Sequence, residues 1–164
     1  MEHELVLLAN QVLSAYKKRG LTLAAAESIT GGLIGHLLTE VPGSSEVFVG
    51  GVVAYHNRLK EQLGVPRATL ETEGAVSDAA AKAMAMGIRG QTGADVGVAV
   101  TGIAGPSGGT KTKQVGLTYV AVCDGRGTVS EAHIWRADRS TNKLLTAQAA
   151  LRLLLARVSA QSES

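Results

Sequence analysis

Apolar residues recur along this chain with two different spacings, which indicate two kinds of secondary structure. Over residues 3–19 they stand three or four positions apart, which predicts an amphipathic helix that ends at Gly20. Elsewhere, short runs rich in Val, Ala and Leu and bounded by Gly, Pro or Asp predict buried strands. We expect helices over residues 3–19, 33–38, 58–63, 77–88 and 141–158, and strands over residues 21–26, 47–55, 95–101, 115–123 and 128–135.

The alternation of these strands and helices predicts a three-layer α/β/α fold. The last two strands are joined by the short turn 124–127, so they add an antiparallel portion to an otherwise parallel sheet. The expected fold class is therefore α/β with a mixed, mostly parallel sheet. A length of 164 residues suits one domain over residues 1–164, because a chain of about 150 residues buries roughly 70% of its unfolded surface.

Composition and charge narrow the classes of partner. Aromatic residues make up only 3% of the chain, so the core must be built from small aliphatic side chains, with close backbone contacts at some of the 20 glycines. The net charge of +2 is scattered, which argues against a nucleic-acid partner. The N-terminus lacks a positive signal region and no apolar run reaches about 18 residues, so we expect a cytoplasmic protein without a membrane partner. A homo-oligomer is compatible with the sequence.

Neither cysteine nor histidine offers a metal site. Cys123 is the single cysteine and lies among apolar residues, so it is expected in the core. The four histidines show no H-x-x-x-H spacing and no pairing with carboxylates at ligand spacing. We therefore expect no metal and no cofactor.

Two glycine-rich turns, residues 27–32 and 101–109, follow predicted strands, the usual place for ligands in open α/β sheets. Residues 105–112 come within one residue of the nucleotide-binding loop G-x-x-x-x-G-K-[ST], but Thr110 replaces the second glycine and a strand follows in place of a helix. An ATPase is thus disfavoured. An anion-binding nest and an ordinary surface loop both remain open for this segment.

Serine and lysine recur together at two places. Ser140 and Lys143 match S-x-x-K, a pattern of some acyl enzymes, although Ser140 suits the N-cap of the last helix better. Asn57 is likewise expected to cap the helix that follows it, and another helix is expected to begin at Ser77. The second place is the turn 42–45, followed across one strand by Tyr55 and Lys60. By spacing alone, this second set fits ordinary turn, strand and surface positions better than an active site.

Six segments occur together in an order that resembles the CinA family, specifically its C-terminal domain. The resemblance covers nearly the whole chain and is carried by Ala26–Gly32 (AESITGG), Val41–Ser45 (VPGSS), Tyr55–Asn57 (YHN), Leu63–Val65 (LGV), Gly74–Ser77 (GAVS) and Ala99–Pro106 (AVTGIAGP). It implies an amidohydrolase that converts nicotinamide mononucleotide to nicotinic acid mononucleotide and ammonia. Activities of the other domain of full-length members are not implied. A non-catalytic nucleotide-binding or interaction module, linked to competence or DNA damage, is the alternative.

The resemblance also implies the residues of the site. Ser45 would be the nucleophile and Lys60 its base, with Tyr55 nearby, while Ser28 is the competing serine. The positions that line the family's site correspond to Thr30, Gly31, Thr101, Gly102, Gly105 and Arg139.

Three positions depart from the family pattern: Ile29 stands where a cysteine is common, Ala137 where a glycine is, and Lys143 where a second arginine is frequent. The base must be neutral to accept the serine proton, so the pKa of Lys60 has to lie well below its ordinary value near 10.4.

Overall fold

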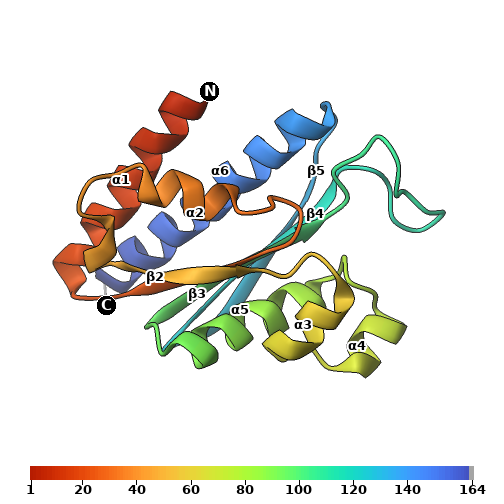
Figure 1. Ribbon diagram of the computed structural model, residues 1–164, viewed down its shortest axis with the longest axis horizontal. Coiled ribbons are helices and arrows are strands. Elements are labelled where there is room, and N and C mark those ends of the chain that lie inside the picture. The colour runs from red at the N-terminus through yellow and green to blue at the C-terminus, as the bar shows by residue number, and fades with distance from the viewer. Residues whose placement is uncertain (163–164) are drawn as a thin grey trace.

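The computed structural model describes residues 1–162 and is built on a five-stranded sheet with the order β2-β1-β3-β4-β5 (Figure 1). The strands are β1 (Leu23–Glu27), β2 (Phe48–Val53), β3 (Val96–Gly102), β4 (Leu117–Asp124) and β5 (Gly127–Ile134). β1 pairs in parallel with β2 and β3, whereas β4 is antiparallel to both β3 and β5. Only β4 runs against the other four strands, which confirms the mixed, mostly parallel sheet.

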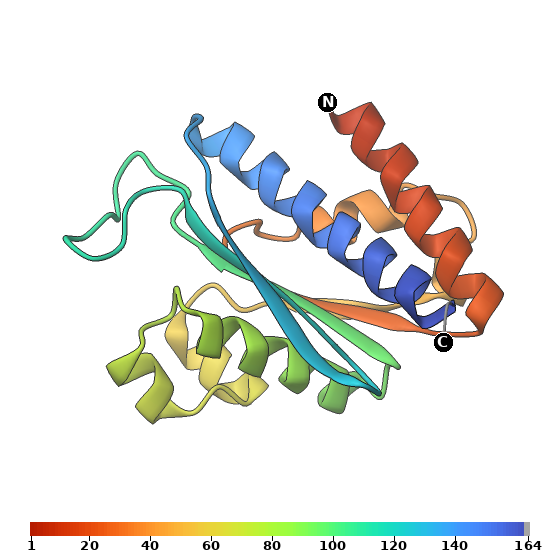
Figure 2. The same cartoon turned by 180° about the vertical axis from the view of Figure 1, so that it is seen from behind.

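Helices cover both faces of the sheet and make it the middle of three layers (Figures 1 and 2). One face carries α1 (Glu2–Arg19), α2 (Leu33–Thr39) and α6 (Arg139–Ser162), and the other carries α3 (Asn57–Leu63), α4 (Arg67–Thr72) and α5 (Asp78–Thr92). The 3₁₀ turn η1 (Ser44–Glu46) precedes β2. The core on the α1–α2–α6 face is rich in Leu and Val, and the core under α5 is rich in Ala, which lets α5 lie close to the sheet. None of the helices in residues 1–162 combines the length and the apolar character needed to cross a membrane.

Helix ends follow the sequence signals in some places and not in others. As predicted, Gly20 ends α1 and a helix begins at Ser77. Gly20 adopts the left-handed conformation, and Ser77 is the N-cap of α5, because its hydroxyl accepts from the Ala80 amide. The predicted cap of α3 is wrong, because His56 Nδ1, and not Asn57, accepts from the Arg58 amide.

The predicted cap of α6 is also wrong. Asp138 Oδ1 accepts from the Thr141 amide, and Ser140 lies inside the helix. α4 was not expected, since Pro66 was interpreted as a stop, yet its fixed φ of −60° suits the residue before a helix.

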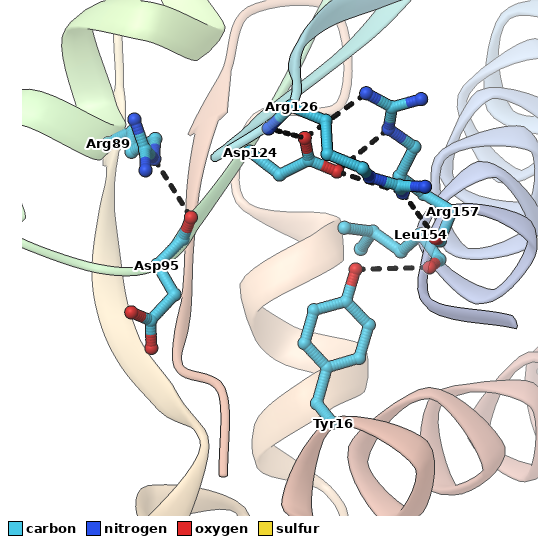
Figure 3. Close-up of polar contacts among 7 residues, drawn as sticks. All are labelled: Tyr16, Arg89, Asp95, Asp124, Arg126, Leu154 and Arg157. Atoms are coloured by element: carbon cyan, nitrogen blue, oxygen red, sulfur yellow. Dashed lines mark hydrogen bonds and ion pairs between the residues drawn. The ribbon is translucent and has the colours of Figure 1, made fainter. Parts of the chain in front are cut away.

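Polar contacts hold together one end of the sheet, at the turn between β4 and β5 (Figure 3). Asp124 accepts hydrogen bonds from Arg157 at 2.7 and 3.1 Å and from the Arg126 amide at 2.8 Å. The Tyr16 hydroxyl donates to the Leu154 carbonyl at 3.0 Å, which joins α1 to α6. Cys123 is buried in β4 beside this turn, as predicted. At the other end of the strands, the connecting loops surround a cavity.

Candidate active site

A cavity of about 320 Å³ opens where β1, β2 and β3 end. Its walls are the turn after β1, the segment between β2 and α3, one side of α3, the segment before α5, the end of β3, the β3–β4 loop and the first turn of α6. The lining residues are Ser28, Ile29, Tyr55, Asn57, Lys60, Ala75, Val76, Thr101, Gly102, Ile103, Ala104, Ser107, Gly108 and Arg139. This is the carboxyl edge of the parallel strands, where ligands of open α/β sheets bind.

Lys60 is the one lysine among the buried polar residues of the described chain, with 1% of its surface exposed. Its Nζ lies 3.0 Å from Ser28 Oγ and 2.8 Å from the carbonyl oxygens of both Ala54 and Tyr55. Burial disfavours the charged amine and lowers the pKa of Lys60 from 10.5 to about 8. The neutral amine is therefore much more populated near neutral pH than it is for an ordinary lysine, although the protonated form still predominates there.

The three contacts of Lys60 match the bonding capacity of a neutral amine. When the amine is neutral, two N–H groups can donate to the carbonyl oxygens of Ala54 and Tyr55, which leaves the lone pair of Nζ for Ser28 Oγ at 3.0 Å. In this state the Ser28 hydroxyl donates to Nζ, which is the hydrogen bond needed to remove its proton. A protonated Lys60 would instead donate to all three oxygens.

The parallel pairing of β1 with β2 brings these two residues together. Glu27 at the end of β1 is in register with Val53 at the end of β2, and the Ala54 amide donates to the Glu27 carbonyl at 2.8 Å. The next residue after Glu27 is Ser28, so it faces the segment that leads into α3. Lys60 then reaches back from α3 across the end of the sheet.

Ser45 does not approach Lys60, so the predicted Ser45–Lys60 pair is wrong as a geometric arrangement. Ser45 lies in η1, before β2 begins, whereas Lys60 lies after β2 ends. A strand of six residues spans about 20 Å, and this length separates the two side chains. Ser45 is exposed, and its neighbour Ser44 lines a different hollow beside α1. Ser28, the competing serine, occupies the position beside the lysine.

The turn after β1 is organised by the buried carboxylate of Glu27. It accepts from the Thr30 hydroxyl at 2.5 Å and from the amides of Gly32, Ile34 and Gly35 at 2.9 to 3.2 Å. These bonds fix the start of α2 and thereby the position of Ser28. Thr30 and Gly31 were expected to bind substrate, but neither belongs to the cavity lining described above. The Thr30 hydroxyl holds the turn through its hydrogen bond to Glu27, and Gly31 adopts the left-handed φ of 61° that the turn requires.

Two of the predicted binding positions on β3 do line the cavity. The Thr101 hydroxyl donates to the Ala75 carbonyl at 2.8 Å, which attaches the segment before α5 to the end of β3. A Cβ atom at Gly102 would lie 2.5 Å from Thr118 Oγ1 and 3.0 Å from Ile29 Cδ1, so only glycine fits there. Gly105 lies just outside the lining, and its carbonyl accepts from Arg139 Nη1 at 2.8 Å.

Arg139 and Tyr55 form the outer wall. Arg139 Nη2 donates to the Tyr55 hydroxyl at 3.3 Å, and the Tyr55 side chain is exposed at the mouth of the cavity. Lys143 stands one helical turn after Arg139, and its Nζ would lie 3.9 Å from a Cβ atom added at Gly31. Arg139 is therefore the cation of the cavity wall, and Lys143 lies one helical turn further on, outside the lining and near Gly31.

The glycine-rich loop between β3 and β4 extends away from the body of the molecule (Figures 1 and 2). It leads into β4 and not into a helix, so it lacks the geometry of a nucleoside-triphosphate loop. Ser107 and Gly108 in this loop line the cavity. Among residues 1–162 no group of three or more His, Cys, Asp and Glu side chains could hold a metal ion.

Sequence reasoning did not assign a role in the cavity to Ala75, Val76 or Ser107, although all three line it. Their signal was present in the Gly74–Ser77 motif and in the glycine-rich loop. Asn57 was expected as a helix cap, but it is the first residue of α3 and lines the cavity.

Comparison with known proteins gives a consistent family assignment. The family model described as CinA C-terminal domain matches residues 6–158. A putative competence-damage inducible protein of Desulforudis audaxviator is 49% identical over 138 residues, which is 84% of this chain and 33% of that protein. A CinA-like protein of Desulfotalea psychrophila is 51% identical over 141 residues, or 85% of this chain and 34% of that protein. The chain therefore spans about a third of the length of these curated relatives.

Solved structures share the fold over nearly the full length of both chains. The competence/damage inducible protein CihA from Agrobacterium tumefaciens has 41% identity and a TM-score of 0.90, with 93% of this chain and 94% of that chain covered. The competence damage-inducible protein A (ComA) from Klebsiella pneumoniae has 30% identity and a TM-score of 0.91, with 94% and 97% covered.

Proposed function

The chain belongs to the CinA C-terminal domain family, and from this membership together with the Ser28–Lys60 pair we propose that it is an amidohydrolase. Its substrate is nicotinamide mononucleotide, which it converts to nicotinic acid mononucleotide and ammonia. The observation that carries the proposal is the 3.0 Å contact between Ser28 Oγ and the buried amine of Lys60 at the wall of a cavity.

The proposed reaction begins when neutral Lys60 accepts the Ser28 proton and Ser28 Oγ attacks the carboxamide carbon. The protonated Lys60 then donates this proton to the leaving nitrogen, so that the C–N bond breaks and ammonia departs. The product of this half-reaction is an ester between Ser28 and the nicotinic acid moiety. Water deprotonated by Lys60 attacks the ester in the second half, which releases nicotinic acid mononucleotide and returns the proton to Ser28.

The negative oxygen of the tetrahedral intermediate needs hydrogen-bond donors beside Ser28. The backbone amides of Ile29 and Thr30 follow the nucleophile directly, and within residues 1–162 neither has a hydrogen-bond partner. We assign them this role. One donor of this kind contributes roughly 2.7–4 kcal/mol in other enzymes.

The substrate phosphate is expected to bind near Arg139 and Lys143. A guanidinium pairs with phosphate through two parallel hydrogen bonds, and the ammonium of Lys143 adds a second positive charge one turn away. Nicotinamide riboside lacks only the phosphate, so its kcat/KM should be at least about 100-fold lower than that of the mononucleotide. Ammonia release from the two substrates measures this ratio. Comparable efficiency on both would contradict phosphate anchoring.

The decisive experiment compares two serine variants by ammonia release from nicotinamide mononucleotide. Ser28→Ala should lower kcat by at least about 1000-fold, because it removes the nucleophile that Lys60 activates. Ser45→Ala is the matched control, since the same atom is removed about one strand length away, and it should keep wild-type turnover. Loss of turnover in Ser45→Ala but not in Ser28→Ala would identify Ser45 in η1 as the nucleophile and would contradict the proposed mechanism.

A non-catalytic nucleotide-binding or interaction module is the alternative. It is favoured by the names of the relatives, which refer to competence and damage induction and to no reaction. Wild-type protein that binds nicotinamide mononucleotide but releases no ammonia, with or without added Mg²⁺, would support this alternative.

A further inference from the structure

The first turn of α6 carries a fully buried amide whose hydrogen bonds join two segments of the site. Asn142 has 0% of its surface exposed. Its Nδ2 donates to the Ala104 carbonyl at 2.9 Å, and its Oδ1 accepts from the Ala137 amide at 3.1 Å. Ala104 lines the cavity, and Ala137 belongs to the connection between β5 and α6. This side chain therefore attaches the start of the β3–β4 loop to the start of α6.

A second contact between the same segments depends on the first. Gly105 follows Ala104 in the chain, and its carbonyl accepts from Arg139, which also donates to the Tyr55 hydroxyl. A shift of the Ala104 carbonyl would carry the Gly105 carbonyl with it and release the guanidinium. Asn142 does not line the cavity, so it reaches the substrate-facing groups only through this chain of contacts.

The core has no need of an amide at this position. An amide is costly to bury unless both its donor and its acceptor are bonded, and Asn is a weaker helix former than Leu, which has a similar size. When both groups are bonded, however, a buried amide holds the segments that it joins in one arrangement, which an apolar side chain does not do. Here the amide bonds to two irregular segments, and one of them is a cavity wall.

We propose that Asn142 is a positioning residue for the amidase reaction. It holds the β3–β4 loop through the Ala104 carbonyl, so that Arg139 and Tyr55 meet the substrate in one geometry. This inference rests on the proposed function for its effect on turnover, whereas its effect on the loop can be measured separately.

The first test is kinetic and uses Asn142→Asp, which keeps the size and the acceptor but loses the donor to Ala104 as a carboxylate. We expect kcat/KM for nicotinamide mononucleotide to fall on the order of 100-fold, with KM raised and kcat lowered. The acid limb of the pH profile should stay in place, because Lys60 contacts Ser28, Ala54 and Tyr55 and not Asn142.

Thr146→Val is the matched control. Thr146 is also fully buried on α6, and its hydroxyl bonds to Trp135 and to the backbone of Asn142, with no contact to the loop. It should lower Tm but leave kcat and KM unchanged. Equal kinetic losses in both variants would overturn the proposal, because they would reduce the role of Asn142 to helix stability.

The second test is a double-mutant cycle with Arg139→Ala. If Asn142 acts through Arg139, the double variant should be about as impaired as the worse single variant. Losses that multiply would mean that the two residues act independently, which would also overturn the proposal.

The third test does not depend on activity. Amide hydrogen exchange in residues 103–116 should accelerate in Asn142→Asp and not in Thr146→Val, and unchanged exchange would overturn the proposal. If wild-type protein releases no ammonia, the proposed function fails, and exchange alone still decides whether Asn142 holds the loop. Should Asn142→Asp not fold, Asn142→Leu replaces it in all three tests with the same expected outcomes.

Discussion

The buried amine of Lys60 costs folding free energy at neutral pH, which is unusual for a residue with no carboxylate partner among its hydrogen bonds. Its pKa is about 8 in the folded protein and near 10.5 in the unfolded chain. Below pH 8 Lys60 is protonated in both states, and burying the charged amine lowers the free energy of unfolding by about 3 kcal/mol. As pH rises from 8 to 10.5 the unfolded state still binds the proton and the folded state does not, so this penalty disappears.

The variant Lys60→Met tests this balance. It removes the penalty, but it also leaves the carbonyls of Ala54 and Tyr55 without their donor, at about 1 kcal/mol each. We expect the variant to be more stable than wild type by about 1 kcal/mol at pH 7 and less stable by about 2 kcal/mol above pH 10.5. Urea unfolding at both pH values measures the difference, and a difference that is constant with pH would contradict the lowered pKa.

The same residue predicts the pH dependence of turnover. Only the neutral amine can accept the Ser28 proton, so wild-type kcat/KM should rise with pH up to about 8. Lys60→Met should be inactive at every pH despite its stability. Lys60→Arg serves as the charged control and should also be inactive, since arginine does not deprotonate in this range.

At the scale of elements, Lys60 depends on how closely α5 packs against α3. A Cβ atom at Gly87 would lie 1.9 Å from the Leu63 carbonyl at the end of α3, which leaves no room for any side chain there. Gly90 is on the same helix and has nothing within 4 Å of the corresponding position. The two glycines therefore belong to the same helix, and they differ only in how closely a neighbouring element approaches them.

Gly87→Ala should destabilise the protein by about 1–3 kcal/mol through overpacking and should also lower kcat, because Lys60 is three residues before Leu63. Gly90→Ala should instead stabilise by up to about 1 kcal/mol, since alanine is the better helix former, and should leave kcat unchanged. Thermal unfolding and ammonia release check both variants. Similar effects of the two substitutions would contradict the close approach of α3 and α5.

Signals that act within one element could be predicted from the sequence, and signals that depend on neighbouring elements could not. Gly20 and Ser77 end and begin their helices because of their own backbone and side-chain chemistry. The capping histidine before α3 was missed, because His56 uses a ring nitrogen where Asn57 offers the more common cap. The order of strands and helices followed from local patterns alone.

Predicting which serine lies beside Lys60 requires the strand order of the sheet. The family resemblance led to Ser45, whereas spacing along the chain favoured ordinary turn and surface positions for the same residues. A strand carries the chain from one end of the sheet to the other along the strand direction, so Ser45, before β2, and Lys60, after β2, lie at opposite ends of that strand. The parallel partner strand ends beside Lys60 instead, and Ser28 follows that end. Residues that follow adjacent parallel strands are the ones to pair, once the strand order is known.

At the scale of the whole molecule, the sheet separates the cavity from the charged cluster at its other end. Thr118, the second residue of β4, pairs with Gly102 at the cavity, and Asp124 ends β4 at the turn into β5. The intervening strand lies in the core between α5 and α6. The charged cluster is therefore far from the cavity, and a substitution in that cluster should change stability without changing turnover.

Asp124→Asn tests this separation. Burial alone raises the pKa of Asp124, but hydrogen bonds from Arg157 and from the Arg126 amide outweigh it and hold the pKa below its ordinary value. The folded pKa is thus below the unfolded one, so the stabilisation is complete above about pH 4 and is lost as pH falls further.

The Asp124→Asn variant should lose about 3 kcal/mol of unfolding free energy at pH 7. This is toward the lower end of the range for buried ion pairs, because the two arginines are partly exposed. This deficit should stay constant down to pH 5 and shrink below pH 4, while kcat/KM of the folded variant equals that of wild type. Asp78→Asn keeps an acceptor for the Ser130 hydroxyl and removes only the charge that pairs with the half-exposed Lys82, so as the control it should change stability by less than about 1 kcal/mol. A loss of turnover in folded Asp124→Asn would show that the two ends of the sheet are coupled, against this expectation.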